Sequence, residues 1–147
     1  MKPSDLSVVR TLSSPTVHPG GRDVVVVLKR PDVDDNRYRT SLWRLALGHD
    51  GGSTDGRDPE PLARLTRGTR DSAPSYSPDG TLIAFLRATE DGPAQLHVMP
   101  ADGGEPRRLT DQPLGAGAPA WSPDGRRIAY VARVPEQGRY GTDEAVK

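Results

Sequence analysis

Short apolar runs, set between polar and turn-forming residues, give this chain its pattern. Three runs, at residues 24–28, 82–86 and 128–132, are each five residues long and almost wholly apolar. They are flanked by glycine and proline, contain β-branched or aromatic residues, and are shorter than a usual helix, so each predicts a β-strand. Since the apolar residues are nearly continuous instead of alternating, we expect strands that are covered on both faces.

The string "SPDG" stands before two of these runs, and an altered copy, "HPGG", stands before the other. Proline fixes φ at about −65°, which suits the second position of a type I turn, and glycine accepts the left-handed conformation that follows. Turns of this kind commonly join antiparallel strands. We therefore predict three hairpin turns, which contain Pro19, Gly20 and Gly21; Ser77, Pro78, Asp79 and Gly80; and Ser122, Pro123, Asp124 and Gly125.

The two intact copies of "SPDG" lie forty-five residues apart, and the residues between them fit four strands. The run at 82–86 is followed by "QLHVMP", by a turn at Asp102, Gly103 and Gly104, and by "PRRLT", a polar strand suited to an exposed edge. The preceding copy spans fifty-nine residues, and the excess falls in "PDVDDNRYRT" and "GHDGGSTDGRDPE". We predict that these two polar stretches are loops.

A repeated unit of four strands and roughly 40–45 residues has the size of one β-propeller blade. The predicted fold class is all-β, with blades of four antiparallel strands in a partial propeller of about two and a half blades. We assign residues 1–13 to an N-terminal lead, 14–70 to blade 1 with loop insertions, 71–115 to blade 2, and 116–147 to the start of a truncated blade 3. A meander or sandwich with similar turns is the alternative. The incomplete blade leads us to expect the front piece of a longer protein.

Charge and composition narrow the range of partners. Twenty Lys and Arg residues balance twenty Asp and Glu residues, so we expect neither nucleic acid nor a membrane as a partner. The chain has no cysteine, which fits a reducing compartment, and its first residues hold no apolar stretch of signal-peptide length. These features favour the cytoplasm.

Residue patterns for catalysis, cofactors and metals are missing from the sequence. The string closest to G-x-S-x-G, at residues 51–55, lacks the second glycine, and His18, His49 and His97 have no metal-ligand spacing. We therefore predict no catalytic residue, no cofactor site and no metal site in this chain. The aromatic residues on predicted strands are expected to pack between blades: Trp43, Tyr76, Phe85, Trp121 and Tyr130.

The segment "RDSAPSYSPDGTLIAFLRATEDGPAQLHVMPADGGEPRRLTD", followed by "APAWSPDGRRIAYVAR", resembles the propeller repeats of two groups of proteins. One is the prolyl oligopeptidase family of serine peptidases, in particular its acylaminoacyl-peptidase-like and dipeptidyl-peptidase-like members. The other is the TolB-like propeller. The opening "PSDLSVVRTLSSPTVHPGG" and the string "RYRTSLWRL" are similar to the first blade of the peptidases.

The resemblance to the peptidases implies a noncatalytic propeller that gates and selects peptide substrates for a C-terminal α/β-hydrolase domain absent from this chain. Its partners would be that domain and the peptides. No residue of the family's Ser-Asp-His triad matches a position here, so hydrolase activity is expected of the parent protein and not of this chain. The alternative is a TolB-like propeller that acts as a protein-binding platform without catalysis.

Overall fold

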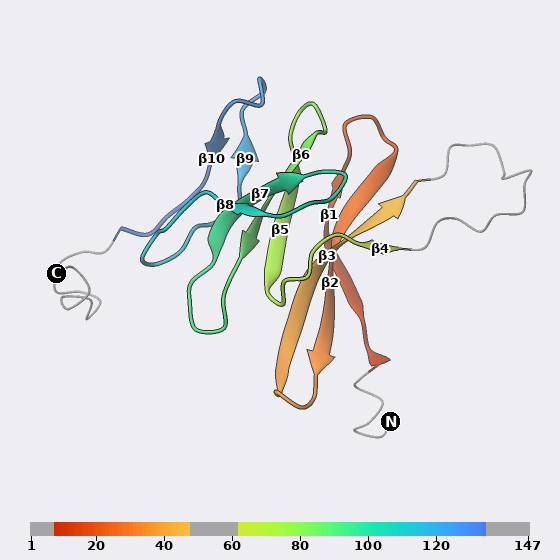
Figure 1. Ribbon diagram of the computed structural model, residues 1–147, viewed down its shortest axis with the longest axis vertical. Helices are drawn as coiled ribbons and strands as arrows, with labels where there is room; N and C mark the ends of the chain where they lie inside the picture. The colour runs from red at the N-terminus through yellow and green to blue at the C-terminus, as the bar shows by residue number, and fades with distance from the viewer. Residues whose placement is uncertain (1–7, 48–61, 135–147) are drawn as a thin grey trace, which may run out of the picture.

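The computed structural model describes residues 8–47 and 62–134, and these residues form two four-stranded sheets and a two-stranded hairpin (Figure 1). The first sheet has the order β1 (Thr11–Val17), β2 (Asp23–Asp32), β3 (Arg37–Ala46), β4 (Ala63–Arg64). The second has the order β5 (Asp71–Tyr76), β6 (Leu82–Arg87), β7 (Gln95–Pro100), β8 (Arg107–Arg108). The hairpin consists of β9 (Ala120–Trp121) and β10 (Ile128–Ala129).

All neighbouring strands in these sheets are antiparallel, which confirms the predicted all-β fold class. Residues 1–7 of the predicted lead, the whole predicted loop at 48–60 and the last part of predicted blade 3 lie outside the described residues. The assignment of residue ranges to blades stays a prediction.

Strand β6 shows why its sequence is apolar at successive positions. Ile83 and Phe85 pack toward the first sheet, whereas Ala84 and Leu86 pack toward the β9–β10 hairpin, and all four are buried. Successive side chains of a strand point to opposite faces, so a strand between two layers needs apolar residues at both its odd-numbered and its even-numbered positions. The strand is therefore covered on both faces, as its composition predicts.

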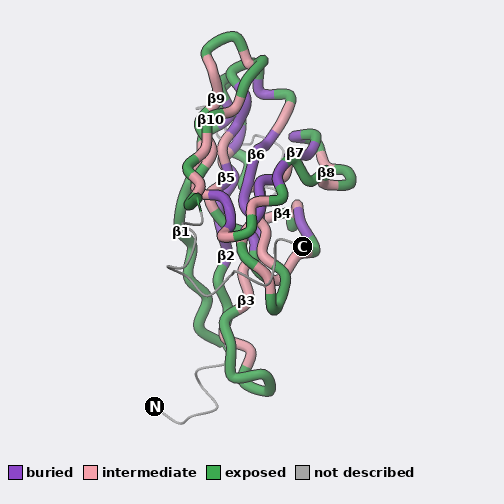
Figure 2. The backbone as a smooth tube through the Cα atoms, turned by 90° about the vertical axis from the view of Figure 1, so that its left-hand side faces the viewer, coloured by how far each residue is buried: buried purple, intermediate pink, exposed green. Residues whose placement is uncertain are grey.

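Two apolar layers join the three groups of strands. The layer between the sheets is made by Val25, Val27 and Leu42 from the first sheet and by Tyr76, Ile83, Phe85, Met99 and Ala101 from the second. The next layer joins the second sheet to Trp121, Ile128 and Tyr130. Figure 2 shows the buried residues along the middle of the molecule, while β1 and the end of the β2–β3 hairpin are exposed.

The predicted aromatic core is present for four of the five residues. Phe85 and Tyr76 are buried between the sheets, and Trp121 and Tyr130 pack against the second apolar layer. Trp43 is half-buried, and its cross-strand partner Val26 places it on the face of the first sheet that points away from the second.

The prediction of a loop at residues 31–40 is wrong. Strand β2 continues to Asp32 and β3 begins at Arg37, so only residues 33–36 turn. The register is unbroken from Asp23↔Ala46 to Asp32↔Arg37. The end of the β2–β3 ladder is stabilised by backbone pairing and by ion pairs of Arg39 with Asp32 and Asp35 instead of by apolar burial. The polar composition of residues 31–40 therefore did not predict these strands.

Candidate functional site

The strands run between two opposite faces of the molecule. One, which we call the connector face, carries the β2–β3 turn, the β6–β7 turn and the connectors at residues 65–70 and 109–119. Backbone hydrogen bonds hold these segments together: Thr40 N–H to Thr69 O (2.7 Å), Ala88 N–H to Arg70 O (3.1 Å) and Ala116 N–H to Ala94 O (2.7 Å). The three proline-glycine turns lie on the other, the turn face, at the top of Figure 1. Asp102 of the β7–β8 turn lines one pocket with Asp79 and Gly80 of this face.

The predicted turn residues form the turn face. In each of the three turns a backbone N–H of the last glycine donates to the carbonyl oxygen three residues earlier: Gly21 to His18 (2.8 Å), Gly80 to Ser77 (2.9 Å) and Gly125 to Ser122 (2.9 Å). These glycines have φ of +69°, +72° and +68°, in the left-handed region that glycine accepts without strain. Pro19, Gly20, Pro78 and Pro123 occupy the inner positions of these turns.

The serine and aspartate of "SPDG" make the same bonds in both intact copies. The Ser77 hydroxyl accepts a hydrogen bond from Leu82 N–H (2.9 Å), and the Ser122 hydroxyl accepts one from Arg127 N–H (3.0 Å). Asp79 and Asp124 accept from their own turn's serine hydroxyl, and this bond is the main reason why the pKa of each carboxyl lies below its ordinary value. In the altered copy the His18 Nδ1 accepts from Gly20 N–H (2.9 Å).

The β7–β8 turn uses the remaining predicted glycines. Gly103 N–H donates to Pro100 O (3.1 Å), with Asp102 inside the turn. Gly103 and Gly104 have φ of +109° and +142°, so both lie in the region where other residues are strained.

The first two turns contact each other directly. A Cβ atom on Gly80 would overlap the imidazole of His18, which is buried and meets the Tyr76 ring edge-on at 5.1 Å between centroids. A Cβ atom on Gly125 would meet only Pro78 Cδ, at 3.7 Å. Gly80 therefore has two reasons to be glycine, its φ and the closeness of His18, whereas Gly125 has one.

The aromatic residue before each "SPDG" bonds backward to the preceding sheet. The Tyr76 hydroxyl donates to Asp23 Oδ1 (2.5 Å), and the Trp121 Nε1–H donates to Ser75 O (3.1 Å). Burial and then the bond to Asp23 raise the pKa of Tyr76, so its phenol stays protonated. These bonds fix the position of each group of strands on the one before it.

A second repeated motif, Arg-Leu-Thr, fastens the outer strand of each sheet. Thr66 Oγ1 accepts from Leu42 N–H and Thr110 Oγ1 accepts from Leu96 N–H, both at 2.9 Å. Arg64 and Arg108 each donate from Nε to the carbonyl of the threonine two residues later, both at 2.7 Å. We did not predict this role, although the repeated "RLT" in "PLARLT" and "PRRLT" is a visible signal.

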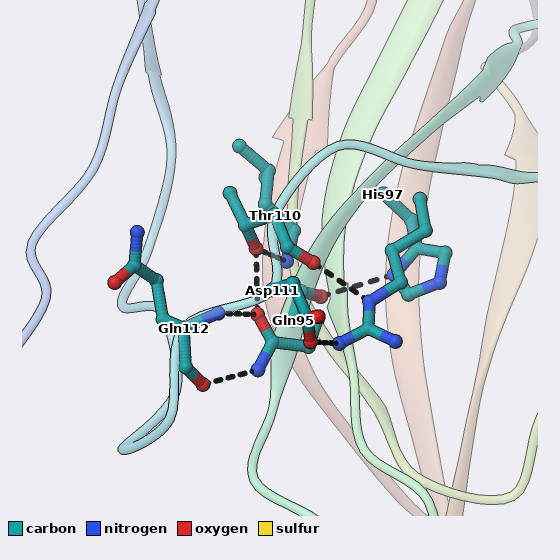
Figure 3. Close-up of polar contacts among 7 residues, drawn as sticks. Gln95, His97, Thr110, Asp111 and Gln112 are labelled. Carbon is teal, nitrogen blue, oxygen red and sulfur yellow. Dashed lines mark hydrogen bonds and ion pairs between the residues drawn. The ribbon is translucent and has the colours of Figure 1, made fainter. Parts of the chain in front are cut away.

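On the connector face, the Gln95 side chain forms a hydrogen-bond network with the second Arg-Leu-Thr motif (Figure 3). Its Oε1 accepts from Thr110 Oγ1 (2.8 Å) and from Gln112 N–H (3.0 Å), and its Nε2 donates to Gln112 O (2.7 Å). The Gln112 side chain then reaches Tyr130 Oη (3.0 Å), which belongs to the next group of strands. The network links the outer edge of the second sheet to that group.

Beside the network lies a stack of charged and aromatic side chains. Asp71 is fully buried and accepts two bonds from Arg87, at 2.7 and 3.0 Å. The Arg87 guanidinium lies 5.2 Å from the centre of the Phe85 ring, and Phe85 stacks on His97 with centroids 5.7 Å apart. The pair keeps the buried carboxylate compensated, which its burial requires.

These side chains border a cavity of about 300 Å³, whose walls include Arg87, Gln95, His97, Arg108 and Asp111. His97 Nδ1 faces Gln95 O at 3.0 Å and must donate to it. Burial lowers the pKa of His97, so the imidazole is neutral near pH 7 and leaves Nε2 as an acceptor. The cavity offers donors, acceptors and a neutral base, which suits recognition of polar groups.

Within residues 8–47 and 62–134 there is no group of three or more His, Cys, Asp or Glu side chains that could hold a metal ion. No helix in that part of the chain is long and apolar enough to span a bilayer. His18 lies on the turn face and His97 lies on β7; His49 lies outside the described residues.

Two curated relatives match nearly all of this chain. It is 31% identical over 132 residues to the uncharacterized peptidase YuxL of Bacillus subtilis and 30% identical over 135 residues to dipeptidyl-peptidase 5 of Porphyromonas endodontalis. The matches cover 90% and 91% of this chain but 19% and 18% of the relatives, so the chain spans about a fifth of their length. No protein-family model matches it.

Solved structures with a similar backbone come from peptidases and TolB. Pyrococcus horikoshii acylaminoacyl peptidase has a TM-score of 0.64 at 22% identity, over 90% of this chain and 19% of the other. The β-propeller domain of the Trilobed protease from Pyrococcus furiosus has 0.60 at 22%, over 84% and 34%. TolB from Acinetobacter baumannii has 0.52 at 16%, over 82% and 37%.

At these identities the structural matches show the fold alone, and the sequence matches show homology to peptidases along nearly the whole chain. A four-stranded antiparallel sheet is the unit of a propeller, so we call the β1–β4 sheet the first blade and the β5–β8 sheet the second blade. The resemblance found in the repeats is confirmed. The chain is a β-propeller section of the kind that peptidases and TolB proteins carry.

Proposed function

We propose that this chain is the noncatalytic propeller part of a serine peptidase and that it gates peptide access to a C-terminal α/β-hydrolase domain. The observation that carries the proposal is the 31% identity to a peptidase over 90% of this chain, together with the chain's being only 19% of that relative's length. The reacting groups would then belong to the other part of the protein, and this chain would contribute groups that recognise the substrate.

A propeller that restricts access must be rigid, and the contacts between neighbouring blades provide this rigidity. Tyr76 and Trp121 bond to the preceding blade, the Gln112 side chain bonds to Tyr130, and two apolar layers fill the space between blades. A channel framed by such blades would admit an extended peptide and exclude a folded protein. We further propose that the protein works in the cytoplasm, for which the absence of cysteine is the support.

A second candidate function is a TolB-like platform that binds a protein partner without catalysis. It is favoured by 42% identity over 55 residues to the Tol-Pal system protein TolB of Thioalkalivibrio sulfidiphilus, a match that covers 35% of this chain. It is the weaker candidate because the peptidase matches extend over 90% of the chain.

The parent protein distinguishes the two functions. We expect its reading frame to continue into a G-x-S-x-G motif with a later Asp and His, and its serine to react with a fluorophosphonate probe. It should cleave short chromogenic peptides, free or blocked at the N-terminus, and leave a folded protein that contains the same sequence intact. A parent protein that ends after its propeller, takes no label and cleaves no peptide would establish the platform instead. Fractionation of the producing cells tests the proposed compartment.

A further inference from the structure

The hairpin of the first blade is longer than that of the second. Strands β2 and β3 have ten residues each, whereas β6 and β7 have six each. Beyond the pair Lys29↔Thr40 the ladder continues through Arg30↔Arg39 and Pro31↔Tyr38 to Asp32↔Arg37. We call residues 29–40 the arm. In Figure 1 the arm projects at the bottom of the molecule, past the β6–β7 turn.

Polar contacts hold the arm in a defined position. Arg39 pairs with Asp32 and Asp35, which ties the turn to β3, and Lys29 Nζ lies 3.9 Å from the centre of the Tyr38 ring. Arg37 reaches Glu90 of the β6–β7 turn at 3.8 Å. The arm is therefore an ordered extension of the blade.

The arm continues a face that is covered elsewhere. The face of the first sheet that packs on the second blade carries Val25, Val27 and Leu42. The alternation of side chains along β2 and β3 places Lys29, Pro31 and Tyr38 on this same face. The second blade ends before the arm, so Tyr38 is 62% exposed and Val33 is 60% exposed. With Val9 and Pro31 they line a groove of about 380 Å³, whose charged residues are Lys29, Asp32 and Arg37. Asp32 pairs with Arg39 and Arg37 with Glu90, so Lys29 is the charged residue of the groove without a carboxylate partner among the described ion pairs.

The topology of the blades determines on which face of the propeller a further domain is attached. Each of the two blades that the structure describes in full has four antiparallel strands, so the chain leaves the blade on the same face on which it entered, as the connector at 65–70 shows. A ring of such blades therefore begins and ends on the connector face, whatever their number. Any domain joined to the ring in sequence is attached on that face, and the arm projects from it.

We propose that the arm and Val9 form the docking surface for the C-terminal hydrolase domain. The inference rests on the proposed function, because it needs that domain to exist. The groove fits a partner surface with apolar side chains for Val9, Pro31, Val33 and Tyr38 and with a carboxylate for the Lys29 ammonium. The arm then sets the distance between the propeller and the domain whose access it controls.

The test is site-specific photocrosslinking in the full-length protein. A benzoylphenylalanine is introduced at Val33 or Tyr38, and the crosslinked peptides are identified by mass spectrometry. Asp102 is the matched control, because it is exposed on a turn of the opposite face. We expect crosslinks from Val33 and Tyr38 to the hydrolase domain within one chain and none from Asp102.

A second variant, Val33→Asp with Tyr38→Asp, places charge where an apolar contact is proposed. We expect faster cleavage of long peptides relative to short ones, by about tenfold, with Asp102→Lys unchanged. Crosslinks to a second copy, or none to the hydrolase domain in a labelled, active peptidase, overturn the docking surface alone. A parent protein without a hydrolase domain overturns the proposed function as well, so the two failures are distinguishable.

Discussion

At the scale of single residues, the two "SPDG" glycines separate backbone strain from steric overlap. Both have positive φ, but only Gly80 faces the His18 ring. We expect Gly125→Ala to lower the free energy of unfolding by about 1 kcal/mol through φ alone. Gly80→Ala should cost about twice as much, and His18→Ala should restore part of the loss in the double variant. Thermal and urea unfolding of the protein that carries this propeller measures the stability of Gly125→Ala, Gly80→Ala, His18→Ala and the Gly80→Ala, His18→Ala double variant. Equal costs for the two glycines would contradict the contact.

The turn serines should control the titration of the turn aspartates. The Ser77 hydroxyl is the largest cause that lowers the pKa of Asp79 from its ordinary 3.8. A carboxyl whose pKa is lower in the folded state stabilises the fold above its unfolded pKa, and this contribution is lost as the pH falls through the folded value. We expect Ser77→Ala to raise the pKa of Asp79, measured by ¹³C carboxyl titration.

Ser122→Ala is the control for that titration, because it should move the pKa of Asp124 and leave Asp79 unchanged. An Asp79 titration that is unaffected by Ser77→Ala would show that the backbone N–H and the hydroxyl of Thr81 hold the carboxylate without the serine.

At the scale of strands, the sequence allowed prediction of those parts whose residues carry their own signal. Apolar composition identified β2 and β6, and proline with glycine identified the turns that precede them. The end of the β2–β3 ladder was missed because pairing, not composition, stabilises it. Two contacts join residues far apart in sequence: that of His18 with Gly80 and the ion pair of Asp71 with Arg87. No local sequence pattern predicts either contact.

The short outer strands depend on their threonine, and the two blades allow a comparison. Thr110→Val removes the acceptor of Leu96 N–H and also the donor to Gln95 Oε1, whereas Thr66→Val removes only the acceptor of Leu42 N–H. An unsatisfied buried polar group costs about 1–3 kcal/mol. We expect Thr110→Val to be the more destabilising, with faster amide exchange at Leu96 and Leu109.

Thr110→Ser keeps the hydroxyl, so it should retain most of the protection from exchange. If Thr110→Val and Thr110→Ser exchange alike, the hydroxyl does not hold β8 in place.

At the scale of the whole molecule, a propeller section is an arc whose blades have two different faces. The second blade is covered on both sides, but the outer face of the first blade is not. Its apolar residues there include Leu12, Val17 and Leu45, which are 53%, 55% and 37% exposed. Val17 and Leu45 both pair with Val24, so they form one continuous patch across three strands.

This patch predicts how the 147-residue chain behaves when it is produced alone. Apolar sheet faces and free strand edges promote association, and the two faces of an arc differ, so copies can add head to tail without closing. We expect self-association that increases with concentration in sedimentation velocity. Val17→Lys with Leu45→Lys should reduce it, because the charges lie in the middle of the patch. Asp102→Lys is the control, since Asp102 is exposed on the β7–β8 turn and not part of the patch, and it should leave association unchanged. A monomer that unfolds cooperatively at all concentrations would mean that one isolated arc already buries enough apolar surface to be stable.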